Sequence, residues 1–241
     1  MIALQGQAAA RSVAVIQSNY IPWKGYFDII HDVDTFIFLD DVQFTARDWR
    51  SRNQIKTQAG VQWLTIPVGP GLDRLIHEVR LVDSRWQRKH WATIVQNYGK
   101  APYFEHYRAF FEHFYLGSAW SSLSEFNQAL TKAIATQCLG LRTQFRDSRE
   151  FTLRGKKLDR LVDLILQAGA TEYLSGPTAR DYIDKSVFDR VNVNLTYKDY
   201  AGYPEYPQRY DGFAHGVSII DVLFNVGPDA PHYIWGWRQG K

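Results

Sequence analysis

Residues 13–41 constrain the fold more than any other part of this chain. A short apolar run, VAVIQ (13–17), precedes a loop that contains Pro22 and Gly25. The next stretch, YFDIIHD (26–32), is typical of a short helix, and a second apolar run, TFIFLDD (35–41), ends in two acids. A strand–helix–strand unit of this kind normally joins two parallel strands by a right-handed crossover. The segment therefore predicts an α/β fold.

The rest of the chain continues the alternation of apolar runs and amphipathic stretches. Further strands are expected at 61–69, 76–83, 143–148, 171–176 and 191–200, and helices at 156–170, 178–188 and 217–227. Three consecutive amphipathic helices within about 84–141 predict a helical block inserted into the core. We expect one α/β domain over residues 12–241, with a mostly parallel sheet, flanking helices and a flexible tail at 1–11.

Composition narrows the class of protein. The net charge is +3, from 28 basic and 25 acidic residues, and no basic stripe typical of a nucleic-acid-binding protein is present in the sequence. The single cysteine, Cys138, excludes an intrachain disulfide and a cysteine-cluster metal site. No segment has the length of a membrane span, and no signal-peptide pattern opens the sequence. We expect a cytoplasmic protein without membrane insertion or nucleic-acid partner; composition leaves its oligomeric state open.

Ligands of open parallel sheets bind beyond the carboxyl ends of the strands, and the loop QSNYIPWKGY (17–26) follows the first strand directly. Gln17 can both donate and accept hydrogen bonds. Tyr20 and Trp23 offer planar faces to a base or sugar, and Lys24 offers a cation that could also serve as an acid or base. The alternative is that the aromatic residues only anchor the following helix. We favour ligand binding for the loop as a whole.

The second candidate segment is LDDVQF (39–44), at the end of the second strand. A carboxylate there could bind Mg²⁺, hold a ribose or act as a base. Adjacent strand residues point to opposite faces, so only one of Asp40 and Asp41 is expected to face the site, and the sequence does not rank them. The alternative is an Asx-type turn that ends the strand.

The stretch RDWRSRNQI (47–55) follows the acidic strand end and carries Arg47, Arg50, Arg52 and Asn53. Arginine side chains recognise carboxylate or phosphate through two parallel hydrogen bonds. We favour an anion contact, with Arg52 and Asn53 as the main candidates, over a loop of solvated charges.

A third segment, YLSGPTARDY (173–182), reads as a strand, a glycine turn and a helix. Backbone N–H groups at a helix N-terminus favour an anion, and the side chains of the turn could add contacts. Ordinary capping explains the same residue types. We favour ligand binding, and the candidates are Ser175, Gly176, Thr178 and Arg180.

The seven histidines show no HExxH pattern and no other metal-ligand pairing, so no metal site built from histidines is expected. His90 lies on a predicted helix with Trp86 at i−4 and is either a packed histidine or a general base. The sequence also lacks a Walker motif, a dinucleotide-binding glycine motif and a GxSxG nucleophile motif.

Taken together, VAVIQSNYIPWKGYF, LDDVQF, RSRNQI, WLTIPV, YLSG with ARDYID, YPQ and SIIDVLFNVG resemble the WbqC-like protein family over nearly the whole chain. The resemblance implies a bacterial protein associated with O-antigen and other surface polysaccharides. The opening of the chain is also similar to the HIGH-motif nucleotidyltransferase superfamily, which implies a related α/β fold. WKGY (23–26) stands in the place of H-x-G-H but has neither histidine, so the resemblance supports the fold rather than adenylyl transfer.

The resemblance and the candidate residues together favour an enzyme of surface-polysaccharide biosynthesis. We expect a transferase for acyl, aminoacyl or nucleotidyl groups, acting on a nucleotide-linked amino sugar or on an acyl or aminoacyl donor. A nucleotide accompanied by Mg²⁺ is the cofactor that the acids and arginines would suit. The alternative is a non-catalytic module that binds a sugar nucleotide within a biosynthetic complex.

Overall fold

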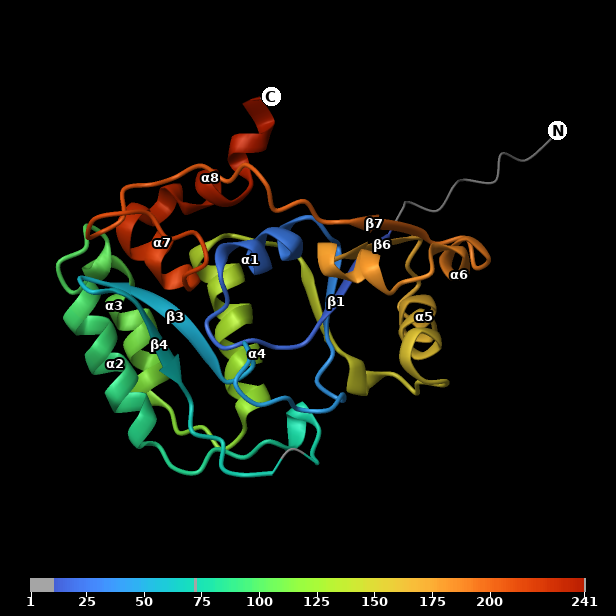
Figure 1. Cartoon of the computed structure of the whole chain (residues 1–241), viewed down its shortest axis with the longest axis horizontal. Helices are drawn as coiled ribbons and strands as arrows, with labels where there is room; N and C mark the ends of the chain where they lie inside the picture. The colour runs from blue at the N-terminus through green and yellow to red at the C-terminus, as the bar shows by residue number, and fades with distance from the viewer. Residues whose placement is uncertain (1–10, 72, 241) are drawn as a thin grey trace.

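A five-stranded parallel sheet forms the centre of the protein (Figure 1). The structure is a computed structural model that describes residues 11–71 and 73–240; the expected tail at 1–11 lies outside these ranges except for Arg11. The strand order is β5-β2-β1-β6-β7. The strands are β1 (Ser12–Ile16), β2 (Thr35–Phe38), β5 (Gln144–Asp147), β6 (Glu172–Ser175) and β7 (Asn194–Tyr197).

The order of the strands places a topological switch point beside the central strand. From β1 the chain first adds β2 and β5 on one side and then returns to add β6 and β7 on the other. Val13 pairs with Thr35 of β2, and Ser12 pairs with Glu172 of β6. In sheets of this kind the ligand crevice lies at the carboxyl ends of the strands that flank the switch point. The predicted α/β fold with a parallel sheet is confirmed.

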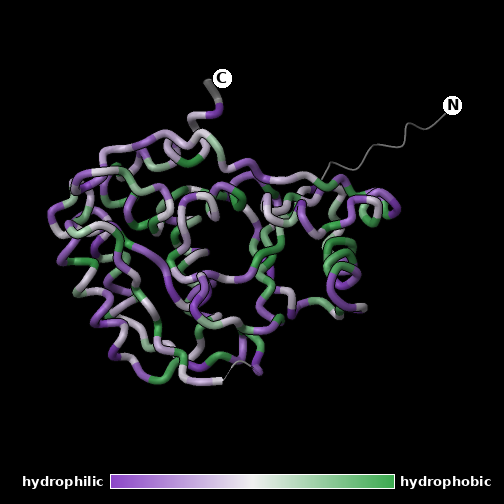
Figure 2. The backbone as a smooth tube through the Cα atoms, viewed as in Figure 1, coloured by the Kyte–Doolittle hydropathy of each residue, from purple (hydrophilic) through white to green (hydrophobic). Residues whose placement is uncertain are grey.

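The two faces of the sheet bury different helices because side chains alternate along each strand. Val13, Val15 and Ile37 pack under α5 (Lys157–Gln167) and α6 (Lys185–Asp189). The opposite face carries Ala14, Phe36 and Phe38 into the larger core, which also contains residues of the other helices. Figure 2 shows the apolar residues concentrated along the strands at the centre of the sheet.

The predicted helical block is present on the larger-core side. It consists of α2 (Arg85–Tyr98), α3 (Phe104–Glu112) and α4 (Leu123–Ala133). Five-residue π-helical turns extend α3 and α4, at η2 (His113–Gly117) and η3 (Ile134–Cys138). The crossover helix α1 (Lys24–His31) and the later α7 (Ile219–Val226), η6 (Gly227–Asp229), α8 (Ala230–Ile234) and η7 (Gly236–Gly240) complete this side.

Two of the expected strands differ in the structure. The strand expected at 61–69 exists as β4 (Gly60–Thr65), but it pairs with β3 (Arg52–Thr57) in a separate antiparallel ribbon. The strand expected at 76–83 is instead a 3₁₀ turn, η1 (Ile76–Glu78), with one isolated bridge beyond it. The backbone N–H groups of Ile76 and His77 donate to Val42 and Asp40, so the segment caps the end of β2 rather than extending the sheet.

The helix expected at 178–188 is divided. Its first part is a 3₁₀ turn, η5 (Pro177–Asp181), and its second part is α6. Asp184 separates them because its carboxylate accepts a hydrogen bond from the backbone N–H of Ser186 and caps a new helix. A shorter 3₁₀ turn, η4 (Ser148–Glu150), follows β5.

The packing of Trp23 against the first turn of α1 can be tested by Gly25→Ala. A Cβ at position 25 would lie 2.2 Å from the indole of Trp23. Alanine is favoured over glycine by about 0.5–1 kcal/mol in a helix interior, but this overlap should reverse the sign. We expect Gly25→Ala to lower the free energy of unfolding by about 1–3 kcal/mol in denaturant titrations.

Gly176→Ala is the matched control, because a Cβ there meets no atom within 4 Å. Its effect should stay below about 0.5 kcal/mol. A Gly25→Ala protein as stable as the wild type would show that the indole does not pack on α1 in this way.

Candidate functional site

A pocket of about 340 Å³ lies at the loop that follows β1, next to the first turn of α1. Three chain segments build it, and its lining residues are Asn19, Pro22, Trp23, Trp49, Asn53 and Gly216. The start of α7 joins these segments, since Ser218 donates its N–H to Gln54 and Ile219 donates to Pro22. The volume is at the lower end of the range of small-molecule sites.

Asn53 fixes the shape of the loop that forms the pocket. Its side-chain amide donates to the carbonyls of Tyr20 at 3.0 Å and Ile21 at 2.9 Å. Ile21 has a φ of +32°, a strained conformation for a β-branched residue. The backbone N–H of Tyr20 donates to the carbonyl of Trp49. Asn53 therefore lines the pocket, but its amide hydrogens bind the protein backbone, and its predicted contact with a ligand stays a prediction.

Lys24, the first residue of α1, is buried among aromatic rings. Its ammonium nitrogen lies 4.9 Å from the ring centre of Tyr203, 5.2 Å from that of Tyr206 and 5.7 Å from that of Phe213. Its hydrogen bond goes to the carbonyl of Pro204, at 3.4 Å. Among the described residues, no acid lies within ion-pair distance of Lys24. Burial lowers the pKa of its amine to about 8, although the negative charge of Asp221 opposes the shift.

Asp221 on α7 is the acidic residue whose negative charge acts on the amine of Lys24. It is fully buried and accepts hydrogen bonds from Tyr98, Tyr206 and Gln208 at 2.7–2.8 Å. Burial raises its pKa, while these hydrogen bonds act in the opposite direction. A second buried lysine, Lys56, donates to Gln208 and to the carbonyl of Tyr210. Asp221 was not anticipated from the sequence, where it sits within an apolar helix.

The carboxylate of Asp40 is buried and occupied by protein groups. One oxygen accepts the backbone N–H of Ser18, and the other accepts the side chains of Ser124 and Gln128. Gln128 also donates to Asp147 at the end of β5. Asp40 thus joins the ends of β1, β2 and β5 to α4, and its oxygens are turned into the protein.

Asp41 points to the other side and forms an ion pair with Arg160 of α5. It also accepts a hydrogen bond from the hydroxyl of Ser148 at 2.6 Å. Burial works against ionisation, but Arg160 and Ser148 hold the pKa of Asp41 below its ordinary value. The two acids do point in different directions, and each has protein partners on both oxygens.

His90 is buried in a polar chain inside the helical block. Its Nδ1 lies 2.7 Å from the hydroxyl of Tyr20, which in turn lies 2.7 Å from the hydroxyl of Tyr115. Burial lowers the pKa of His90 to about 4, against a hydrogen bond to the backbone of Thr65. His90 and Tyr20, both predicted site residues, therefore lie in the core, and Tyr20 is fully buried.

The remaining predicted residues are spread along the carboxyl edge of the sheet. Gln17 directly follows β1, Ser175 is the last residue of β6, and Gln17 is half-buried. Gly176 precedes η5, and Thr178 is exposed. The guanidinium of Arg180 lies 5.1 Å from the ring of Tyr197. Because η5 is a short 3₁₀ turn, the helix N-terminus expected to hold an anion is absent from this position.

Arg52 lies against tryptophans that the sequence reasoning passed over. Its guanidinium carbon is 4.1 Å from the ring centre of Trp63, and Trp63 contacts Trp49 with ring centres 5.4 Å apart. Trp49 itself lines the pocket. Trp49 stands within the arginine-rich stretch 47–55, where only the charged and amide side chains were predicted to bind a ligand.

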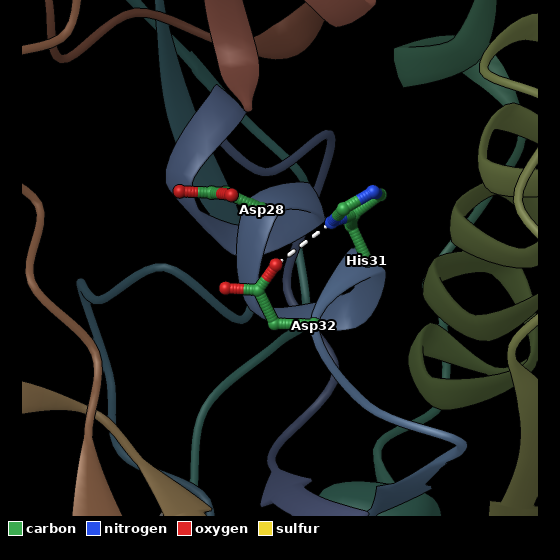
Figure 3. A group of neighbouring side chains, drawn as sticks. All are labelled: Asp28, His31 and Asp32. Atoms are coloured by element: carbon green, nitrogen blue, oxygen red, sulfur yellow. Dashed lines mark hydrogen bonds and ion pairs between the residues drawn. The ribbon is translucent and has the colours of Figure 1, made fainter. Parts of the chain in front are cut away.

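A cluster of two aspartates and a histidine lies in and directly after the C-terminal half of α1, away from Lys24 at its first residue (Figure 3). Asp28, His31 and Asp32 are close enough together to hold a metal ion. However, Asp28 and Asp32 each pair with both Lys198 and Arg238. Two carboxylates are balanced by two cations, so this cluster ties the C-terminal segment to α1.

Comparison with known proteins identifies the relationship. A sequence profile of the WbqC-like protein family matches residues 17–233. The chain belongs to the WbqC-like protein family. It is 44% identical over 231 residues to the uncharacterized protein Rv1507c of Mycobacterium tuberculosis (strain ATCC 25618 / H37Rv), covering 95% of this chain and 100% of that protein. No solved structure matches the chain. Within the described residues, no helix has the length and apolar character needed to cross a membrane.

The buried position of Asp40 predicts a structural effect for Asp40→Asn. The new amide would place N–H groups opposite the donors of Ser18, Ser124 or Gln128. We expect a loss of about 2–4 kcal/mol in the free energy of unfolding. Asp41→Asn, whose partner Arg160 is partly exposed, should cost only about 1 kcal/mol. Equal losses would contradict the different burial of the two acids.

The low pKa of His90 predicts a pH effect on stability. Its folded pKa of about 4 is below the ordinary 6.5, so the unfolded chain takes up the proton first as the pH falls. Stability is lost from pH 6.5 down to about 4. Between pH 7 and pH 4.5 the wild type should lose about 2 kcal/mol more than His90→Gln. The free energies of unfolding are measured by denaturant titration at each pH. An equal loss in the wild type and in His90→Gln would contradict a buried neutral histidine.

Proposed function

We propose that this protein is a cytoplasmic enzyme of surface-polysaccharide biosynthesis of the O-antigen type. It would be a transferase that acts on a nucleotide-linked amino sugar or on an acyl or aminoacyl donor. Membership of the WbqC-like family supports the pathway. The pocket beside the switch point of a parallel sheet, with Trp23 and Trp49 in its walls, supports a small-molecule ligand with a flat ring.

The observation that carries the proposal is the state of Lys24. The lysine follows the pocket residue Trp23 in sequence. The residue is 2% exposed, and the pKa of its amine is lowered to about 8. A general base works best when its pKa is near the operating pH. We assign to Lys24 the removal of a proton from the acceptor hydroxyl or amine. The acceptor oxygen or nitrogen then bonds to the transferred group as the bond between that group and the rest of the donor breaks, and the rest of the donor departs with the electron pair of the broken bond.

The acids predicted from the sequence take a different place in this proposal. Asp40 positions the end of β1 through Ser18, and Asp41 is paired with Arg160. An Mg²⁺ ion bound to Asp41 would have to displace Arg160 or Ser148, so the acids do not fit a resident metal site. No step is assigned to them.

The occupied carboxylates also favour a second candidate function, the non-catalytic module that binds a sugar nucleotide. Such a module would need the pocket but no group that moves a proton. The two functions differ in their dependence on Lys24. Binding without turnover on any donor would favour the module.

A thermal-shift panel identifies the donor class first. The panel contains ATP, CTP, UDP- and dTDP-sugars, acyl-CoAs and free amino acids, each with and without Mg²⁺. A ligand that binds the native state raises the melting temperature by mass action. A shift with one class selects the donor for turnover assays by mass spectrometry. If no compound of the panel raises the melting temperature, that result would contradict a small-molecule donor.

Lys24→Met tests the catalytic role. Methionine fills a similar volume among aromatic rings, so the variant should keep its stability and its affinity for the donor. Turnover should fall at least about 100-fold. Because the neutral amine is the active form, the wild-type rate should rise with pH and level off above about 8.

The control is Lys89→Met, which removes an exposed lysine of α2 and should leave the rate unchanged. A Lys24→Met enzyme with the wild-type rate and pH profile would overturn the assignment. An unstable variant would show that the ammonium is needed to build the cage of rings.

A further inference from the structure

Trp49, Trp63 and Arg52 form a row of contacts that we call the indole–guanidinium row. The guanidinium of Arg52 packs on Trp63, Trp63 packs on Trp49, and Trp49 reaches the pocket. Arg52 and Trp63 stand on the neighbouring strands β3 and β4, so the antiparallel ribbon holds them in place.

The tryptophans of the row are unusually open to solvent. Trp49 is 45% exposed and Trp63 is 39% exposed, and their rings are tilted by 37°. Large aromatic rings are normally buried, and a contiguous exposed pair is a common mark of a binding surface. The row therefore extends the flat walls of the pocket outward along the ribbon.

The charge of Arg52 is not balanced by a neighbouring acid. Among residues 11–71 and 73–240, no carboxylate lies within ion-pair distance of Arg52, whereas the nearby Arg50 is paired with Asp48. The Nε atom of Arg52 is buried without a hydrogen-bond partner. No carboxylate lines the pocket either. A half-buried cation beside a pocket that lacks acids favours a ligand with a negative charge.

We propose that the indole–guanidinium row is a subsite for a ring that carries a negatively charged group. The ring would stack on Trp49, and the charged group would accept hydrogen bonds from Arg52, whose side chain Trp63 holds in place. This inference rests on the proposed function, because it takes the pocket as the binding site. The charged group is either the phosphate of a nucleotide or the carboxylate of an acidic sugar.

Pairs of ligands that differ only in the charge can test the subsite. Uridine is compared with UMP, adenosine with AMP, and glucose with glucuronate, by following indole N–H signals of labelled protein in NMR titrations. Trp49→Phe and Trp63→Phe proteins assign the two signals. We expect a charged ligand to bind at least about tenfold more tightly than its neutral partner and to shift both signals. The pair with the larger preference distinguishes a nucleotide from an acidic sugar.

Variants distinguish the contribution of the Arg52 charge to ligand affinity from the contribution of the Trp49 ring. Arg52→Gln should bring the preference close to unity and leave the neutral ligand unaffected, and Arg52→Lys should retain part of the preference. Trp49→Ala should weaken both members of a pair at least about fivefold. The control is Arg85→Gln, which removes an arginine whose side chain is 82% exposed, and it should behave as the wild type.

Equal affinity within every pair, no binding by any ligand, or an unchanged preference in Arg52→Gln would overturn the subsite. The proposed function can fail separately. The protein could bind charged ligands with the expected preference and yet show no turnover that depends on Lys24. That result would support the subsite and contradict the transferase function.

Discussion

The side-chain amide of Asn53 is the interaction on which the candidate site depends. It holds the carbonyls of Tyr20 and Ile21, and it keeps Ile21 at a φ of +32°. Without these two hydrogen bonds the loop would relax to an ordinary conformation, because a β-branched residue gains free energy by leaving positive φ. The loop fixes where α1 begins, and so where Trp23 and Lys24 stand. One amide on the ribbon thus positions a wall of the pocket and the lysine behind it.

The environment of Lys24 combines two opposing effects. The surrounding rings attract an ammonium ion through their faces, whereas the loss of water disfavours the charged form. Desolvation is the larger effect, since the pKa falls to about 8 despite the negative charge of Asp221. The aromatic rings make a buried amine tolerable without an acid beside it. An ion pair with Asp221 would have given a more stable but less reactive cation, which is the usual arrangement for a structural lysine.

The sequence predicts the parts of this structure that depend on local patterns. Apolar runs separated by an amphipathic helix were sufficient to place β1, α1 and β2, and the rule for ligand sites pointed to the loop beside which the pocket lies. The ribbon was missed because β3 carries Arg52 and Asn53, which resemble loop residues, and its pairing with β4 supplies the stability that its composition does not. The cage around Lys24 is formed by residues 203–213, and contacts across such a distance in sequence leave no local pattern.

The acidic residues of α1 connect the C-terminal segment to the candidate site. Asp28 lies one helical turn after Lys24, and Tyr203 contacts both of them. Its hydroxyl donates to Asp28 at 2.6 Å, while its ring faces the ammonium group. Asp28 in turn pairs with Lys198 and Arg238. The ion pairs that fasten β7 and the C-terminal turn to α1 therefore also set the position of one wall of the lysine cage. Tyr203 also packs edge-on against the pocket residue Trp23, with ring centres 5.9 Å apart, so one tyrosine connects the buried charged network both to Lys24 and to a wall of the pocket.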